Sequence, residues 1–239
     1  MNKVVKTLAV VGSFGVLAGT PATRGAVIVT EIHYNGNGGE TVPTEWIEIY
    51  NDGSETVDLS GWDWGDSQDG TFTGNFAAGT SLAAGKAAIL VAQSPDTFAG
   101  IWGPGIQVIQ TDIGPGLANG ATATNELVVL RNANDEVVDA VNYENALNGW
   151  PDDNNQSSIY LKPGSLDVLS NDIGTNWGLS AVGVDGAYEA QTLNPDIANA
   201  TLRDIASPGV VAVPEPAGLA IAGFAGLTLL ARRRRAVRA

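Results

Sequence analysis

Two clusters of acidic and amide side chains carry the residue types that bind hard cations. They are Asp63, Asp66 and Asp69 in one glycine-containing stretch, and Asp152, Asp153, Asn154 and Asn155 in a second patch. Calcium takes several carboxylate and carbonyl oxygens, and flexible loops can supply them. Neither spacing matches the EF-hand loop, so the clusters predict either a calcium site or solvated acidic turns.

Nucleophilic and histidine-based metal chemistry have few residues to draw on. The chain has one histidine, His33, and no cysteine. A Ser-His-Asp triad would have to use His33, which lies in a run of β-strand composition, so we expect a structural role for it. The glycine-rich stretches at 36–39 and 114–120 lack the following helix and lysine of a phosphate-binding loop.

Paired carboxylates are the remaining route to catalysis, because glycoside hydrolases use two of them. Residues 27–212 contain 25 acidic and four basic residues, a net charge of minus 21, and no spacing selects two of the acids as a pair. A body this acidic repels nucleic acid and anionic lipid, and it can gather divalent cations. We therefore expect no enzymatic activity, no nucleic-acid partner and no cofactor other than an optional calcium ion.

The body of the chain consists of short β-prone runs separated by turn residues. Nine runs have this character: 27–34, 45–50, 57–64, 70–76, 87–92, 106–110, 126–131, 137–143 and 158–161. Residues 126–143 predict a hairpin, because Asn132 to Asp135 supply turn residues between two apolar runs. No window shows helical periodicity. Strands of this number and spacing predict an all-β, two-sheet antiparallel sandwich.

Alternation within the runs predicts which side chains share a face. In the first run, Val29, Glu31 and His33 fall on one face, and Ile32 and Tyr34 fall on the other.

The tryptophans divide into two predicted groups. Trp46, Trp62 and Trp150 lie beside turn residues and are expected in the core, with carbohydrate stacking as the alternative. Trp64 and Trp102, flanked by Gly and Asp, are the candidates for exposed stacking platforms.

Three ordered motifs resemble the opening of a lamin-tail domain: residues 29–35 (VTEIHYN), 45–51 (EWIEIYN) and 57–62 (VDLSGW). The similarity continues in 127–130, 137–143, Trp150-Pro151, Asn176-Trp177 and Ser207-Pro208-Gly209, while the Gly-rich stretch 65–123 departs from it. The resemblance implies an immunoglobulin-like antiparallel β-sandwich over residues 27–212. In bacteria this family commonly accompanies extracellular or surface proteins, sometimes fused to hydrolases and nucleases.

The first 26 residues have the layout of a secretory signal peptide. Lys3 and Lys6 precede an apolar run at 8–18, and small residues follow. Cleavage after Ala22 and cleavage after Ala26 are both open, and either one predicts export.

Residues 213–239 form a second targeting segment. Pro214, Glu215 and Pro216 fix an extended stretch, an apolar run covers 217–231, and Arg232, Arg233, Arg234 and Arg235 follow it. The run predicts one short transmembrane helix whose arginines remain in the cytoplasm. Its 15 residues span about 22 Å against a hydrocarbon core of about 30 Å, which favours a transient stop over an ordinary membrane anchor.

This order of tag, apolar helix and arginine cluster closely resembles the PEP-CTERM protein-sorting signal. The resemblance implies export through the inner membrane of Gram-negative bacteria that make exopolysaccharide. It also implies processing near Pro214-Glu215-Pro216 by an exosortase, a membrane-embedded cysteine transpeptidase. The product would pass from an inner-membrane intermediate to the cell envelope, the outer surface or the extracellular matrix.

Together these features predict an exported surface or matrix protein with a structural or adhesive role. The expected partners are an exosortase, exopolysaccharide and surface proteins. Two alternatives stay open: a glycan- or calcium-dependent ligand-binding module, and a secreted hydrolase that uses carboxylates.

Overall fold

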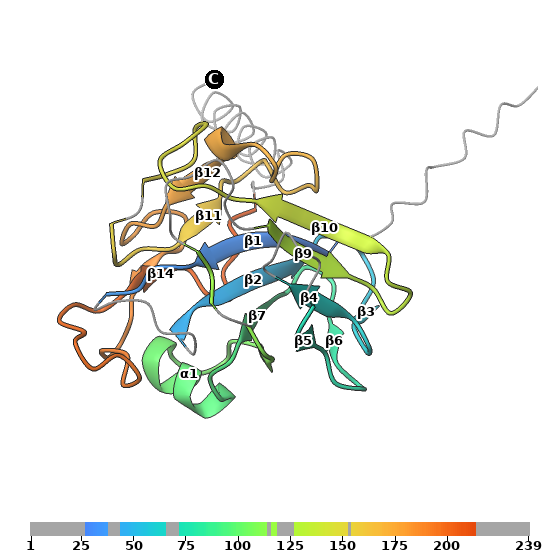
Figure 1. Cartoon of the computed structure of the whole chain (residues 1–239), viewed down its shortest axis with the longest axis horizontal. Coiled ribbons are helices and arrows are strands. Elements are labelled where there is room, and N and C mark those ends of the chain that lie inside the picture. Colours follow the sequence, from blue (N-terminus) through green and yellow to red (C-terminus); the bar gives the residue numbers. More distant parts are fainter. Residues whose placement is uncertain are drawn as a thin grey trace, which may run out of the picture.

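Two β-sheets packed face to face form the body of the protein (Figure 1). The computed structural model describes residues 27–37, 44–65, 72–113, 116–118, 127–152 and 154–213. The predicted β-sandwich is confirmed in its main part: the described chain is mostly β, and both sheets contribute buried side chains to one apolar core.

The larger sheet has the strand order β12-β11-β1-β2-β7-β8. Its strands are β1 (Val27–His33), β2 (Trp46–Asn51), β7 (Ala87–Val91), β8 (Val108–Gln110), β11 (Ile159–Leu161) and β12 (Trp177–Leu179), the last preceded by the 3-10 helix η2 (Gly174–Asn176). Every residue of β1 and β2 is buried. These two strands therefore form the centre of the molecule.

The smaller sheet has the order β10-β9-β4-β5. Its strands are β4 (Asp63–Gly65), β5 (Gly74–Asn75), β9 (Leu127–Arg131) and β10 (Val137–Asn142), and two further ribbons pair β3 (Val57–Asp58) with β6 (Ser81–Leu82) and β13 (Tyr188–Glu189) with β14 (Ile205–Ala206). Strands β9 and β10 are antiparallel neighbours, which confirms the predicted hairpin. Its turn contains Asp135 with a positive φ of 60°, a conformation that Asp tolerates.

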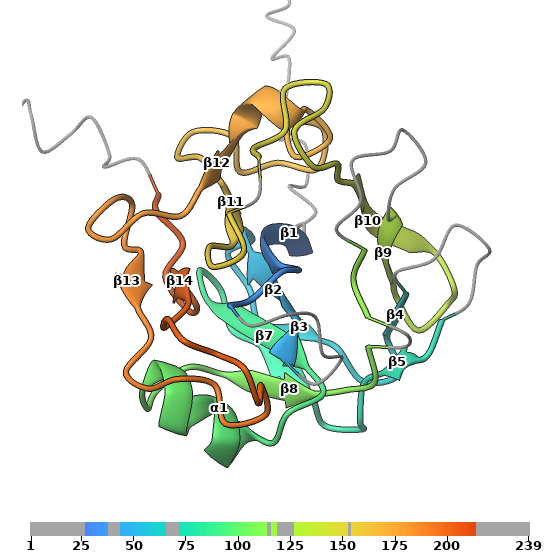
Figure 2. The same ribbon diagram turned by 60° about the vertical axis from the view of Figure 1, so that its left-hand side comes forward.

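A second apolar cluster covers the outer face of the larger sheet. Figure 2 shows helix α1 (Pro95–Trp102) and the β13–β14 ribbon on the side opposite to β9 and β10. Trp46 and Ile89 from the sheet pack there with Phe98 and Trp102 of α1. Because both faces of the larger sheet are covered, the sandwich has a third, partial layer.

The described body contains a short helix, although no window of its sequence shows helical periodicity. Helix α1 has eight residues, which is too short for a helical period to stand out in the sequence. Its local start signal is present, however: the Ser94 Oγ accepts a hydrogen bond of 3.2 Å from the Thr97 N–H, and Pro95 occupies the first turn.

Helix α1 also explains why one strand departs from the antiparallel expectation. Strands β7 and β8 are parallel, and a parallel pair needs a crossover of about a dozen residues or more. Residues 92–107, which include α1, provide that crossover.

The predicted alternation in β1 fails after Val29. The pairing register with β2 shifts between Val29 and Glu31, as at a β-bulge, and such an extra residue moves all later side chains to the opposite face. Val29, Ile32 and Tyr34 consequently lie in the core between the sheets.

The tryptophan predictions are half right. Trp46, Trp62 and Trp150 are buried as expected. Trp64 and Trp102 are only 1% and 3% exposed, so the prediction of exposed stacking platforms is wrong. Trp64 lies in β4 under Gly74, and Trp102 ends α1 in edge contact with the Tyr188 ring.

The two predicted targeting segments, residues 1–26 and 213–239, lie outside the described residues except for Val213, so the predicted transmembrane helix lies outside them too. The described part of the chain contains no helix with the length and apolar character needed to cross a membrane.

Gly74 is predicted to be required for packing, because a Cβ there would lie 1.9 Å from the Trp64 Nε1. Overpacking of this kind costs about 1–3 kcal/mol, and urea unfolding of Gly74→Ala should show a loss of that size. Gly100 in α1 has no neighbour within 4 Å of an added Cβ. The control Gly100→Ala should therefore gain about 0.5–1 kcal/mol, and equal effects of the two changes would contradict the described packing.

Candidate functional site

Two glutamates meet on the outer face of the larger sheet. Glu31 on β1 and Glu48 on β2 are register partners, and their exposed fractions are 0% and 1%. Neither carboxyl forms an ion pair with a described Lys, Arg or His. Buried carboxyls without a cation need hydrogen-bond donors, and these come from four segments.

Glu31 is held by three serines. Its Oε1 accepts hydrogen bonds from the Ser158 Oγ, from the Ser207 N–H at 2.8 Å and, more weakly, from the Ser180 Oγ at 3.4 Å. Its Oε2 accepts from the Ser207 Oγ at 2.8 Å. The carboxyl therefore connects β1 to the edge of β11 and to the chain that follows β14.

Glu48 has one donor from its own sheet and one from the end of the described chain. Its Oε1 accepts a 2.8 Å hydrogen bond from the Thr30 Oγ1, and its Oε2 accepts a 2.6 Å bond from the Gly209 N–H. Through Ser207 and Gly209, the two glutamates bind the segment at residues 207–213, which we call the C-terminal segment.

Burial dominates the electrostatics of the pair. It raises the pKa of Glu31 from 4.5 to about 7, against the opposing effect of the serine hydrogen bonds. Burial, and next the charge of Glu31, raise the pKa of Glu48 well above its ordinary value. The pair therefore holds at least one proton near neutral pH.

Two tyrosines and an aspartate border the pair. Burial is the main cause that raises the pKa of Tyr160 and of Tyr188 to about 12 each. The Tyr160 hydroxyl donates a 2.7 Å hydrogen bond to the Asp185 Oδ2, and the Tyr188 hydroxyl donates at 2.9 Å to the Trp102 carbonyl. Both phenols stay neutral at physiological pH and act as hydrogen-bond donors.

The space beside the carboxyls is too small for a sugar. A cavity of about 10 Å³ lies among Glu31, Glu48, Tyr160 and Val210, which is room for about one water molecule. Among the residues that the structure describes, no three His, Asp or Glu side chains form a group that could hold a metal ion. The arrangement can bind backbone N–H groups and exchange a proton.

Asp139 is a third buried carboxyl, and it joins the two sheets. Its Oδ2 accepts hydrogen bonds from the Val29 N–H at 2.7 Å and from the Asn171 Nδ2 at 2.8 Å. Burial raises the pKa of Asp139 from 3.8 to about 6. Asp139 thus binds β10 of the smaller sheet to β1.

Of the first candidate calcium cluster, Asp63, Asp66 and Asp69, the structure describes Asp63 alone. Asp63 accepts two hydrogen bonds from Arg131, at 2.8 Å from Nε and 2.6 Å from Nη2, and the Arg131 guanidinium lies 3.4 Å from the Phe72 ring centre. Asp66 and Asp69 lie outside the described residues. The one described member of the cluster is therefore committed to an arginine.

The second candidate cluster has turn-forming contacts. Asp152 is exposed and Asp153 lies outside the described residues. The Asn154 Oδ1 accepts from the Gln156 and Ser157 N–H groups, and the Asn155 Oδ1 accepts a 2.8 Å bond from the Asn35 Nδ2. The predicted sorting residues Pro214, Glu215, Pro216 and Arg232 to Arg235 also lie outside the part of the chain that the structure describes.

Sequence reasoning did not single out Glu31 and Glu48. The available signal was that each glutamate lies within a β-prone run with many apolar residues, Glu31 in 27–34 and Glu48 in 45–50. The expected alternation placed Glu31 on the same face as Val29, however, and the register shift reverses this.

The paired sheets, their shared core and the covered outer face define an immunoglobulin-like β-sandwich module, a class with structural and binding roles. The model of the Lamin Tail Domain family matches residues 20–145, more than half of the 239 residues, and the chain belongs to this family. No curated protein matches the chain. Glu31 and Glu48 lie within the matched residues, whereas Ser158, Ser180 and Ser207 follow them.

The glutamate pair predicts that folding stability falls as the pH rises. Both groups have a pKa that is raised in the folded chain, so the folded state binds more protons than the unfolded state above the unfolded value of 4.5, and for Glu31 this excess ends at about 7. The stabilisation from both groups is complete below pH 4.5, and the part from Glu31 is lost as the pH rises through 7, with a slope of up to about 1.4 kcal/mol per pH unit for each proton. Urea unfolding between pH 5 and pH 8 measures this slope.

Glu48→Gln should flatten that slope, because an amide does not titrate. Its oxygen can accept from the Gly209 N–H, and its NH2 can donate to the Thr30 Oγ1 in place of the bond that Glu48 accepts from that hydroxyl. The exposed Glu55 provides the control, and Glu55→Gln should leave the slope unchanged. A slope of opposite sign, or no change in Glu48→Gln, would contradict the protonated pair.

Proposed function

We propose that this protein is an exported module that displays its lamin-tail domain at the cell surface or in the extracellular matrix. Residues 1–26 direct export, and an exosortase processes the chain near Pro214-Glu215-Pro216. The displayed domain is non-enzymatic, needs no cofactor, and has a structural or adhesive role in contact with exopolysaccharide or surface proteins.

The observation that carries this proposal is the attachment of the C-terminal segment. Ser207 and Gly209 are bound by the carboxyls of β1 and β2, the most buried strands of the fold. Further bonds hold β14 nearby: the Ile205 N–H donates to the Gln156 carbonyl at 2.9 Å, and the Ser158 N–H donates to the Ile205 carbonyl at 3.0 Å. If the domain is attached through the residues that follow 213, a force applied there would be transmitted to β1 and β2 at the centre of the larger sheet.

Surface charge supports the same role. The body carries a net charge of minus 21, and its described cations include Arg131 and Arg203, which are paired with Asp63 and Glu189. A strongly acidic domain stays soluble at high local concentration and is repelled by nucleic acid and anionic lipid. These properties suit a protein that is displayed away from the membrane.

The test is the intact mass of the mature protein from its native host, with peptide mapping of both ends and of the matrix fraction. The wild-type chain should lack its signal peptide and everything beyond the Pro214-Glu215-Pro216 region. A Pro214→Ala, Pro216→Ala double variant should keep its tail and remain in the membrane fraction.

Pro163 is an exposed turn proline, so Pro163→Ala is the matched control and should be processed normally. A wild-type chain that is intact through Ala239 would overturn the sorting proposal.

A further inference from the structure

Strand β8 is an edge of the larger sheet. In the order β12-β11-β1-β2-β7-β8 it has one neighbour, β7, among the described strands. An edge strand presents a row of N–H and C=O groups that can pair with another chain.

The hydrogen-bond pattern shows which groups of β8 face outwards. The Ile89 N–H donates to the Gln107 carbonyl at 2.9 Å, and the Thr111 N–H donates to the Val91 carbonyl at 2.9 Å. In a parallel ladder alternate residues face the neighbour, so residues 107, 109 and 111 bond to β7. The main-chain groups of Val108 and Gln110 therefore point away from β7, and no backbone partner for them occurs among the described residues.

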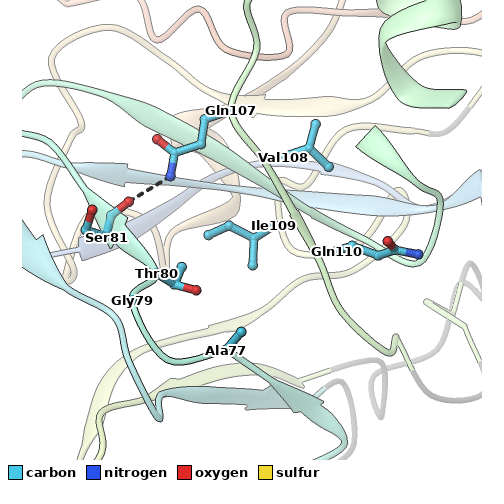
Figure 3. A pocket seen from close by; sticks show the side chains of 8 residues that line it. All are labelled: Ala77, Gly79, Thr80, Ser81, Gln107, Val108, Ile109 and Gln110. Carbon is cyan, nitrogen blue, oxygen red and sulfur yellow. Dashed lines mark hydrogen bonds between the residues drawn. The ribbon is translucent and has the colours of Figure 1, made fainter. Parts of the chain in front are cut away.

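A groove runs along this outward side (Figure 3). Its volume is about 350 Å³, and Ala77, Gly79, Thr80 and Ser81 form the wall opposite β8. The Gln107 Nε2 crosses the groove to donate a 2.7 Å hydrogen bond to the Ser81 carbonyl. The groove therefore has space for a short extended peptide.

The described residues that form this edge carry no charge. Natural edge strands are usually protected by lysine, proline or inward-pointing charges. Residues 105–111 contain none of these, and all eight residues that line the groove are uncharged. The edge is therefore open to strand addition, although the surrounding body carries a net charge of minus 21.

We propose that β8 binds an extended segment of a partner protein as an added strand, and that this segment carries Lys or Arg on either side of the paired residues. The uncharged groove accepts the strand, and the acidic body attracts the flanking cations. A second copy of this chain fits less well, because two bodies of minus 21 repel each other. The proposal names the partner class for the proposed adhesive role and rests on that role for its biological setting.

The test uses the purified domain and a fluorescent probe of about nine residues, alternating Val and Thr with an Arg at each end. Anisotropy titration should show saturable binding, and a probe with Glu at both ends should bind at least about tenfold more weakly. This binding assay does not involve the tail, so it can fail while processing at Pro214-Glu215-Pro216 succeeds, and the reverse is equally possible.

Val108→Pro removes one outward N–H and leaves the bonds to β7 intact, because proline is tolerated at an edge position that faces away from the sheet. It should weaken binding of the Arg-flanked probe at least about tenfold, whereas Val108→Ala, which keeps the N–H, should have little effect. Ala77→Trp should block the groove from the opposite wall without touching β8, so it tests the proposal even if Val108→Pro does not fold.

Three results would overturn the proposal. They are no saturable binding, binding that is unchanged in both Val108→Pro and Ala77→Trp, and a concentration-dependent dimer of the wild-type chain that Val108→Pro abolishes. The last result would make a second copy the occupant.

Discussion

Burying two carboxyl groups without a cation costs free energy unless each finds hydrogen-bond donors. Glu31 and Glu48 find them in serine hydroxyls, in Thr30 and in the backbone of Ser207 and Gly209. This requirement fixes the positions of β11, the chain after β12 and the C-terminal segment around the same two strands. The strands that are most buried are thereby also the strands to which the end of the described chain is bound.

The register shift in β1 makes the pair possible. One extra residue after Val29 places Glu31 opposite Glu48 and leaves the Thr30 hydroxyl free to donate to Glu48. The same shift lets Ile32 and Tyr34 enter the core between the sheets. A local irregularity of the backbone thus serves both apolar packing and a polar attachment on the opposite face.

The sequence was sufficient to predict the sandwich and the β9–β10 hairpin, because alternating β-prone runs and turn residues are local signals. It was not sufficient to predict which face of the sheet each β1 side chain occupies after Val29. The residue types around Glu31 and His33 give no sign of the bulge. The Gly and Asp neighbours of Trp64 and Trp102 led to the wrong prediction that both are exposed. Their burial depends on contacts with residues that are not sequence neighbours: Trp64 packs against Gly74, and Trp102 packs against Tyr188. The Glu31–Glu48 pair could not be selected from 25 acids without the register.

Amide hydrogen exchange at Ser207 and Gly209 tests the central claim most directly. If the carboxyls hold the C-terminal segment, both amides should exchange as slowly as those of β1 and β2, and Glu31→Ala should release Ser207 before the core strands open. Rapid exchange of both amides in the wild-type chain, beside a protected β1, would show that the buried pair does not bind the segment.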